Sequence, residues 1–166
     1  MYQTIDAFLD DWKGETATTL RVLRLLTDGS LRQKVTPEGR SLGFLSWHLA
    51  LTIAEMGGKA GLPVSGPAED APPPATAAEI VAAYEAAARS LAEVARSRWN
   101  DRMLGDEVTL YGRPWRRASI LVSLVRHQIH HRGQMTVLMR QAGLPVPGIY
   151  GPAREEWAKM GMPPQE

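Results

Sequence analysis

The chain has 166 residues, with 19 Lys and Arg against 18 Asp and Glu and a formal net charge of +1. This length fits one domain, and a hydrophobic content of 44% excludes a wholly disordered protein. The balanced charge offers no basic surface of the kind that nucleic-acid-binding proteins carry, so we expect no nucleic-acid partner. The chain has no cysteine, which excludes disulfides, thiolate zinc sites, iron–sulfur clusters and a cysteine nucleophile.

The sequence shows neither a secretory signal nor a membrane-spanning segment. Residues 1–6 contain no basic start and lead into no apolar signal stretch. The longest aliphatic cluster, Ile120 to Val125, is interrupted by Ser123 and is too short to cross a bilayer. We therefore expect a cytoplasmic protein with no membrane partner.

Two amphipathic helices are predicted in the first third of the chain. In residues 4–26, apolar side chains recur mainly at steps of three and four, which places them on one helical face. The second helix should begin at Ser41, a favourable N-cap residue, and run through Glu55 until Gly57-Gly58 interrupts it.

Two further helices are predicted in the second half. The capping box Thr76–Glu79 opens the third, which should end near residues 99–100. The fourth extends from about Trp115 to Ala142 and is ended by Gly143 and Pro145.

The remaining segments are predicted to be loops or short elements. Residues 61–75 contain five prolines and two glycines and are expected to form a surface loop. Residues 108–113 suit a short strand or hairpin arm, limited by Pro114. The Pro/Gly-rich tail should hold a short helical piece near residues 155–157. We therefore predict an all-α, antiparallel four-helix bundle that forms a single domain over residues 1–166.

Three of the four histidines lie close together in the fourth predicted helix: His127, His130 and His131. His127 and His131 are one helical turn apart, so their Cβ atoms should lie about 5–6 Å apart on one face. Two imidazole nitrogens at that spacing can reach one ion at about 2.0–2.1 Å. The face is otherwise mostly apolar and should point inward; its other members are Ile120, Leu124, Gln134 and Leu138. The arginines of this helix, Arg126, Arg132 and Arg140, project elsewhere.

The fourth histidine, His48, lies in the middle of the second predicted helix beside the apolar residues Phe44 and Leu45. A buried imidazole is costly unless its nitrogens have partners. A divalent cation shared with His127 and His131 would supply one, and the core of a helical bundle is a usual place for such a site. Three protein ligands leave a fourth position open, which is the coordination of catalytic zinc sites.

Simpler interpretations of these polar residues remain open. A single histidine on an apolar face is often a hydrogen-bonded core residue, and an i,i+4 pair can face solvent. His130 should mainly pack or form a hydrogen bond, although it could replace His131 as a ligand because residues three apart also share a face. Glu55 is a candidate general base or neighbour of the site, but pairing with a basic residue is the more ordinary role. Gln134 and Thr52 could contact a water or orient an imidazole.

The spacing H-x-x-x-H also occurs in zinc proteases, where the first histidine is followed by a glutamate that acts as general base. Gln128 occupies that position here and cannot act as a base. The sequence contains no Gly-rich phosphate loop, Ser/His/Asp motif or dinucleotide fingerprint. The pattern therefore indicates a metal site without assigning a reaction.

The histidine segments resemble those of the DinB (damage-inducible) family. Residues 127–134 read HQIHHRGQ and residues 138–143 read LMRQAG, followed by PGIYGP at 147–152. Upstream, residues 45–49 read LSWHL and match the first histidine segment of that family. The resemblance covers nearly the whole chain.

This resemblance implies an antiparallel four-helix bundle, usually dimeric, with a three-histidine metal site. Carried over by position, the metal ligands would be His48, His127 and His131, and the ion would be zinc, nickel or another divalent metal. Related bundles include thiol-dependent transferases and a maleylpyruvate isomerase that use low-molecular-weight thiols as cosubstrates. The resemblance transfers no substrate.

Three functions follow as hypotheses. The first is a metal-dependent enzyme, a thiol S-transferase or hydrolase, in which the open position activates a water or a thiol toward a small electrophilic substrate. The second is a non-catalytic metal-binding stress-response module, whose fourth position would be filled by a protein ligand such as Glu55 or His130. The third is a structural homodimer with vestigial histidines.

Overall fold

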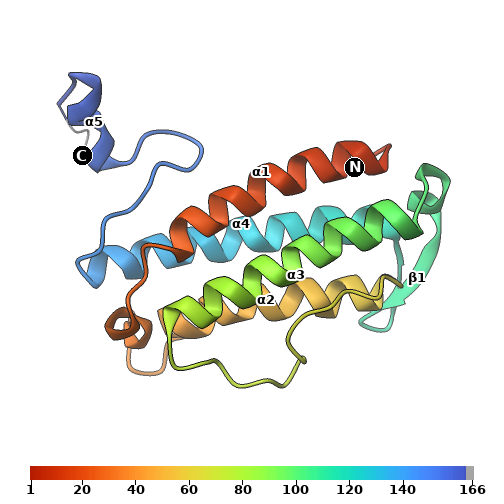
Figure 1. Ribbon diagram of the computed structural model, residues 1–166, viewed down its shortest axis with the longest axis horizontal. Coiled ribbons are helices and arrows are strands. Elements are labelled where there is room, and N and C mark those ends of the chain that lie inside the picture. Colours follow the sequence, from red (N-terminus) through yellow and green to blue (C-terminus); the bar gives the residue numbers. More distant parts are fainter. Residues whose placement is uncertain (164–166) are drawn as a thin grey trace.

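The computed structural model describes residues 1–163 and is mostly helical (Figure 1). Its long helices are α1 (Ile5–Leu23), α2 (Leu42–Lys59), α3 (Ala77–Arg98) and α4 (Arg117–Gln141). The predicted domain extended to residue 166, and its last three residues lie outside the described part. Shorter elements connect the helices or follow them: η1 (Asp28–Arg32), η2 (Asp101–Gly105), α5 (Arg154–Trp157) and η3 (Ala158–Met160).

Side-chain caps define where the first three long helices begin. The hydroxyl of Thr4 accepts a hydrogen bond from the amide of Ala7, and Ser41 does the same for Phe44. Thr76 begins α3 with the complete capping box that the sequence predicted. These caps satisfy amides that the first turn of a helix leaves without an intrahelical partner.

Two helix ends differ from the prediction. α1 ends at Leu23 rather than Leu26, because the backbone tightens into i→i−3 hydrogen bonds and Thr27 then caps η1. α2 continues through Gly57 to Lys59. A Cβ atom at Gly57 would lie 2.5 Å from a methyl carbon of Val64, so this glycine makes room for the returning loop without ending the helix.

The long helices contact one another around a common core. α2 packs against α3 and α4, and α1 packs against the same two helices from the other side. In Figure 1, α1 and α4 run in one direction and α2 and α3 in the other. The α1–α3 and α2–α4 contacts are therefore antiparallel, whereas the α2–α3 and α1–α4 contacts are parallel, so the predicted antiparallel arrangement holds for only part of the packing. The Pro-rich connection over residues 60–76 makes the parallel course of α2 and α3 possible, since it returns along the length of α2.

A small hairpin precedes α4. Its strands, β1 (Glu107–Leu110) and β2 (Arg113–Arg116), pair antiparallel around Tyr111 and Gly112, whose φ angles are 51° and 75°. Positive φ at both positions is typical of two-residue hairpin turns. Pro114 lies inside β2 rather than ending the strand, which a two-stranded ribbon tolerates because one side of each strand is unpaired. The predicted start of α4 is therefore two residues early, because residues 115–116 continue β2.

The core draws large side chains from every long helix. Fully buried examples include Trp12 of α1, Ile53 of α2 and Tyr84 of α3. Arg132 of α4 belongs to the same set of fully buried side chains, although it carries a charge. None of the helices in the described chain has the combined length and hydropathy needed to cross a membrane.

Candidate metal centre

The histidines predicted as ligands come together between α2 and α4. Nε2 of His127 lies 3.1 Å from Nε2 of His48 and 3.1 Å from Nε2 of His131. The ligand atoms of all three residues lie within 4.8 Å of one another. The antiparallel contact between α2 and α4 brings His48 opposite the i,i+4 pair of α4, so both local spacing and helix packing create the cluster.

The nitrogen separations fit a shared ion. Two nitrogens that bind one ion at about 2.0–2.1 Å lie about 2.8–3.4 Å apart when they subtend about 90–110° at that ion. The observed separations of 3.1 Å fall within this range. The donor set consists of imidazoles alone, which suits zinc, nickel, copper or iron.

A hydrogen bond on the far side of the His131 ring indicates which of its nitrogens faces the centre with a lone pair. Nδ1 of His131 lies 2.7 Å from Oε1 of Gln134, which can only accept, so Nδ1 carries the proton. The hydroxyl of Thr52 donates to the carbonyl of His48 at 2.9 Å, and its oxygen lies 3.5 Å from Nδ1 of His127. The Gln134 contact directs the Nε2 lone pair of His131 toward Nε2 of His127, 3.1 Å away.

Burial keeps all three imidazoles in the neutral form that binds metals. It lowers the pKa of His127 to about 4, with a further contribution from the neighbouring His131. Burial also lowers the pKa of His48 and of His131. Because a ligating imidazole must be unprotonated, the cluster is ready to bind metal at neutral pH.

The residues considered as a fourth ligand are engaged elsewhere. Oε1 of Glu55 accepts hydrogen bonds from Nζ of Lys59 at 2.5 Å and from the hydroxyl of Tyr111 at 2.9 Å. Burial raises the pKa of Glu55, but the contacts with Lys59 and Tyr111 outweigh it and lower the pKa overall. His130 is exposed and accepts a hydrogen bond from Nε2 of Gln134 at 3.1 Å. Among the described residues, the candidate ligand group therefore contains only the three predicted histidines.

Gln128 and Arg132 have positioning roles that the sequence analysis missed. Gln128 is fully buried, and its amide donates to the carbonyl of Leu49 at 3.2 Å, next to His48. Arg132 projects away from the histidines, as expected, but its side chain is only 1% exposed. Helical periodicity predicts the direction of a side chain and not the partner that it meets in another helix, so neither contact could be found from the sequence.

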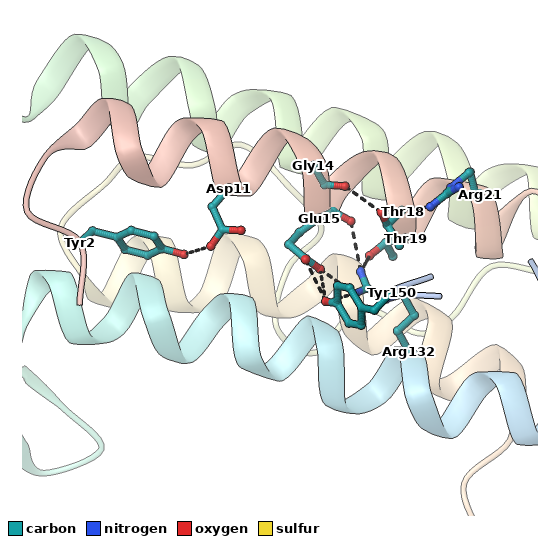
Figure 2. A network of polar contacts seen from close by, with 9 residues as sticks. All are labelled: Tyr2, Asp11, Gly14, Glu15, Thr18, Thr19, Arg21, Arg132 and Tyr150. Carbon is teal, nitrogen blue, oxygen red and sulfur yellow. Dashed lines mark hydrogen bonds and ion pairs between the residues drawn. The ribbon is translucent and has the colours of Figure 1, made fainter. Parts of the chain in front are cut away.

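Arg132 is the centre of a polar network that joins α4 to α1 and to the tail (Figure 2). Its Nη2 donates to Oε2 of Glu15 at 2.6 Å and to the hydroxyl of Tyr150 at 2.5 Å. Its Nη1 donates to the hydroxyl of Thr19 at 3.0 Å. The hydroxyl of Tyr150 in turn donates to Glu15 at 2.8 Å. The network fixes α4 against α1 directly after the last histidine of the cluster.

Comparison with known proteins gives consistent matches over most of the chain. The sequence matches the DinB family over residues 1–166. It is 44% identical over 162 residues to "Uncharacterized protein YrdA" of Bacillus subtilis (strain 168), covering 98% of this chain and 97% of that protein.

Two solved structures are similar in fold. A DinB-like protein from Bacillus cereus ATCC 10987 has a TM-score of 0.87 and 43% identity, covering 90% of this chain and 100% of that one. A second DinB-like protein, YjoA from Bacillus subtilis, has a TM-score of 0.68 over 89% of this chain and 99% of that one. Its identity is 14%, so this likeness concerns the fold alone.

Proposed function

The chain belongs to the DinB family, and from that premise we propose that it is a divalent-metal-binding protein whose ligands are His48, His127 and His131. The convergence of the three Nε2 atoms at this cluster is the observation that carries the proposal. The contacts of α1 to α4 around one core support a four-helix bundle as the scaffold of the site. Among the ions that suit this all-imidazole set we favour zinc and nickel, the two that the DinB resemblance names.

We propose further that the site is catalytic, as a thiol S-transferase or a hydrolase. Three protein ligands leave a coordination position open, and the described chain brings no fourth donor to it. An ion held in this way would supply a nucleophile near neutral pH by lowering the pKa of a water or of a low-molecular-weight thiol. We also propose that the protein is a homodimer, as the DinB resemblance implies.

The side chains around the cluster have separate tasks in this proposal. Gln134 and Thr52 orient the rings of His131 and His127 through their Nδ1 atoms. The ring of Phe44 stacks on His48 at a centroid distance of 5.8 Å and shields it from water. Glu55 is held by Lys59, so we assign it to the packing of α2 against the hairpin rather than to proton transfer.

Metal titration of single-histidine variants tests the ligand assignment. Metal-stripped protein without a histidine tag is titrated with zinc and with nickel by calorimetry. We expect the native chain to bind about one equivalent, and His48→Ala to lose tight binding while circular dichroism shows intact helices.

His130→Ala is the matched control, because His130 lies on the same helix but outside the ligand group. It should bind metal nearly as the native chain does. Native protein that takes up well under one equivalent, or a His48→Ala variant with native affinity, would refute the proposed site.

A further inference from the structure

A pocket of about 350 Å³ lies beside the candidate metal centre. It is lined by the segment before α2, by α2 itself and by the C-terminal half of α4. The two regions share Gln134, which lines the pocket and accepts the hydrogen bond from His131. This volume is within the range of small-molecule sites, about 300–1,000 Å³. A ligand held here would therefore lie next to the histidines.

The walls of the pocket are mainly apolar. Leu45, Leu138, Val35 and Val137 contribute most of them. Val35 and Val137 are unusually exposed for aliphatic side chains, at 62% and 53%. Burial of these apolar groups under a ligand with an apolar body would favour binding, because it removes apolar surface from water.

Arg40 provides the one charge among the residues that line the pocket. Within residues 1–163 it forms no ion pair and donates no side-chain hydrogen bond, and its guanidinium carbon lies 5.1 Å from the centre of the Phe44 ring. The ring of Phe44 in turn stacks on His48 at a centroid distance of 5.8 Å. The unpaired guanidinium is therefore separated from His48 by a single aromatic ring.

Building on the proposed function, we infer that this pocket binds a small carboxylate with an apolar body, which pairs with Arg40 while its body contacts Val137 and Leu45. A guanidinium matches a carboxylate with two parallel hydrogen bonds and binds it better than it binds a neutral polar group. No acidic side chain lines the pocket to oppose an anion, and Arg40 would repel a cationic ligand. The substrate class of the metal centre is therefore an apolar carboxylic acid.

Hexanoate and hexanol are suitable probes, since they share an alkyl chain and differ in charge. Their dissociation constants are measured on the zinc-loaded protein by NMR titration. We expect the native chain to bind hexanoate more tightly than hexanol. Arg40→Gln should weaken hexanoate binding about fivefold, the effect of a partly exposed charge pair, without changing hexanol binding.

Arg98→Gln is the matched control, because Arg98 is also exposed but is the last residue of α3, whose C-terminal end lies far from the start of α2 (Figure 1). It should bind both probes as the native chain does. Equal hexanoate affinity in Arg40→Gln and Arg98→Gln would overturn the inference, as would equal affinity of the native chain for hexanoate and hexanol.

A metal-free variant separates this inference from the proposed function. Hexanoate should still bind His48→Ala, because Arg40 and the apolar walls remain. Hexanoate binding that is lost in His48→Ala but kept in Arg40→Gln would show that the carboxylate binds the metal instead, which overturns the role of Arg40. If the native chain bound no metal, the proposed function would fail, while hexanoate binding that depends on Arg40 would still support the pocket.

Discussion

Replacing Gln134 by leucine tests how α4 orients its histidines. Oε1 of Gln134 accepts a hydrogen bond from Nδ1 of His131 at 2.7 Å, and His131 is only 5% exposed. With leucine in this position, metal binding forces His131 to keep an unpaired N–H in a buried place, at a cost of about 1–3 kcal/mol. Partners of this kind typically contribute 10–100-fold to metal affinity, or about 1.4–2.7 kcal/mol. We expect Gln134→Leu to weaken zinc binding by a factor in that range.

Two further variants make this test specific. Gln134→Glu keeps an acceptor opposite His131 and adds charge, so it should bind zinc at least as tightly as the native chain. Gln141→Leu makes the same exchange at an exposed position of α4 and should have no effect. Competition with a chromophoric chelator gives the three affinities. Equal zinc affinity in Gln134→Leu and Gln141→Leu would refute the orienting role.

Two predictions concern stability. In metal-free protein, the pKa of His127 is lowered to about 4, so between pH 4 and 6.5 the unfolded chain binds more protons than the folded one. The free energy of unfolding should fall by about 1–2 kcal/mol as the pH drops from 6.5 to 4, after allowance for partial exposure of the ring. Urea titrations check this, and an equally steep decline in His127→Ala would contradict it. Arg132→Met should cost about 3 kcal/mol because it leaves the carboxylate of Glu15 buried without its positively charged partner. Arg140→Met removes an exposed ion pair with Glu155 and should lower the free energy of unfolding by less than about 1 kcal/mol. Similar losses of stability in Arg132→Met and Arg140→Met would contradict the larger contribution expected of the buried pair.

Features that depend on neighbours along the chain could be predicted from the sequence. The caps at Ser41 and Thr76 involve residues three positions apart, and the pairing of His127 with His131 needs one helical turn. The inward position of His48 follows from its apolar neighbours in the same helix. In each case the relevant geometry is set by helical periodicity, which the sequence displays directly.

Features that depend on packing between distant segments could not be predicted in the same way. The parallel course of α2 and α3 depends on the path of the loop over residues 60–76, and loop composition does not specify a direction. The partner of Arg132 lies in α1, 117 positions away. Arg40 borders the pocket only because the start of α2 packs against the end of α4. No pattern among neighbouring residues in the sequence specifies these contacts between distant segments.

The polar residues of segment 127–134 together explain why the metal ligands can hold a defined geometry. The separation between His48 and the other ligands depends on the axial position of α4 against α2, and a slide by one residue would move α4 about 1.5 Å. That displacement is about half of the 3.1 Å between the ring nitrogens. Gln128 fixes α4 against α2 through the carbonyl of Leu49, and Arg132 fixes it against α1. Loss of Arg132 should therefore lower both stability and zinc affinity, whereas loss of Gln134 should lower zinc affinity alone. Measuring both stability and zinc affinity for a variant at Arg132 and a variant at Gln134 therefore distinguishes a residue that holds α4 in place from one that orients a histidine ring.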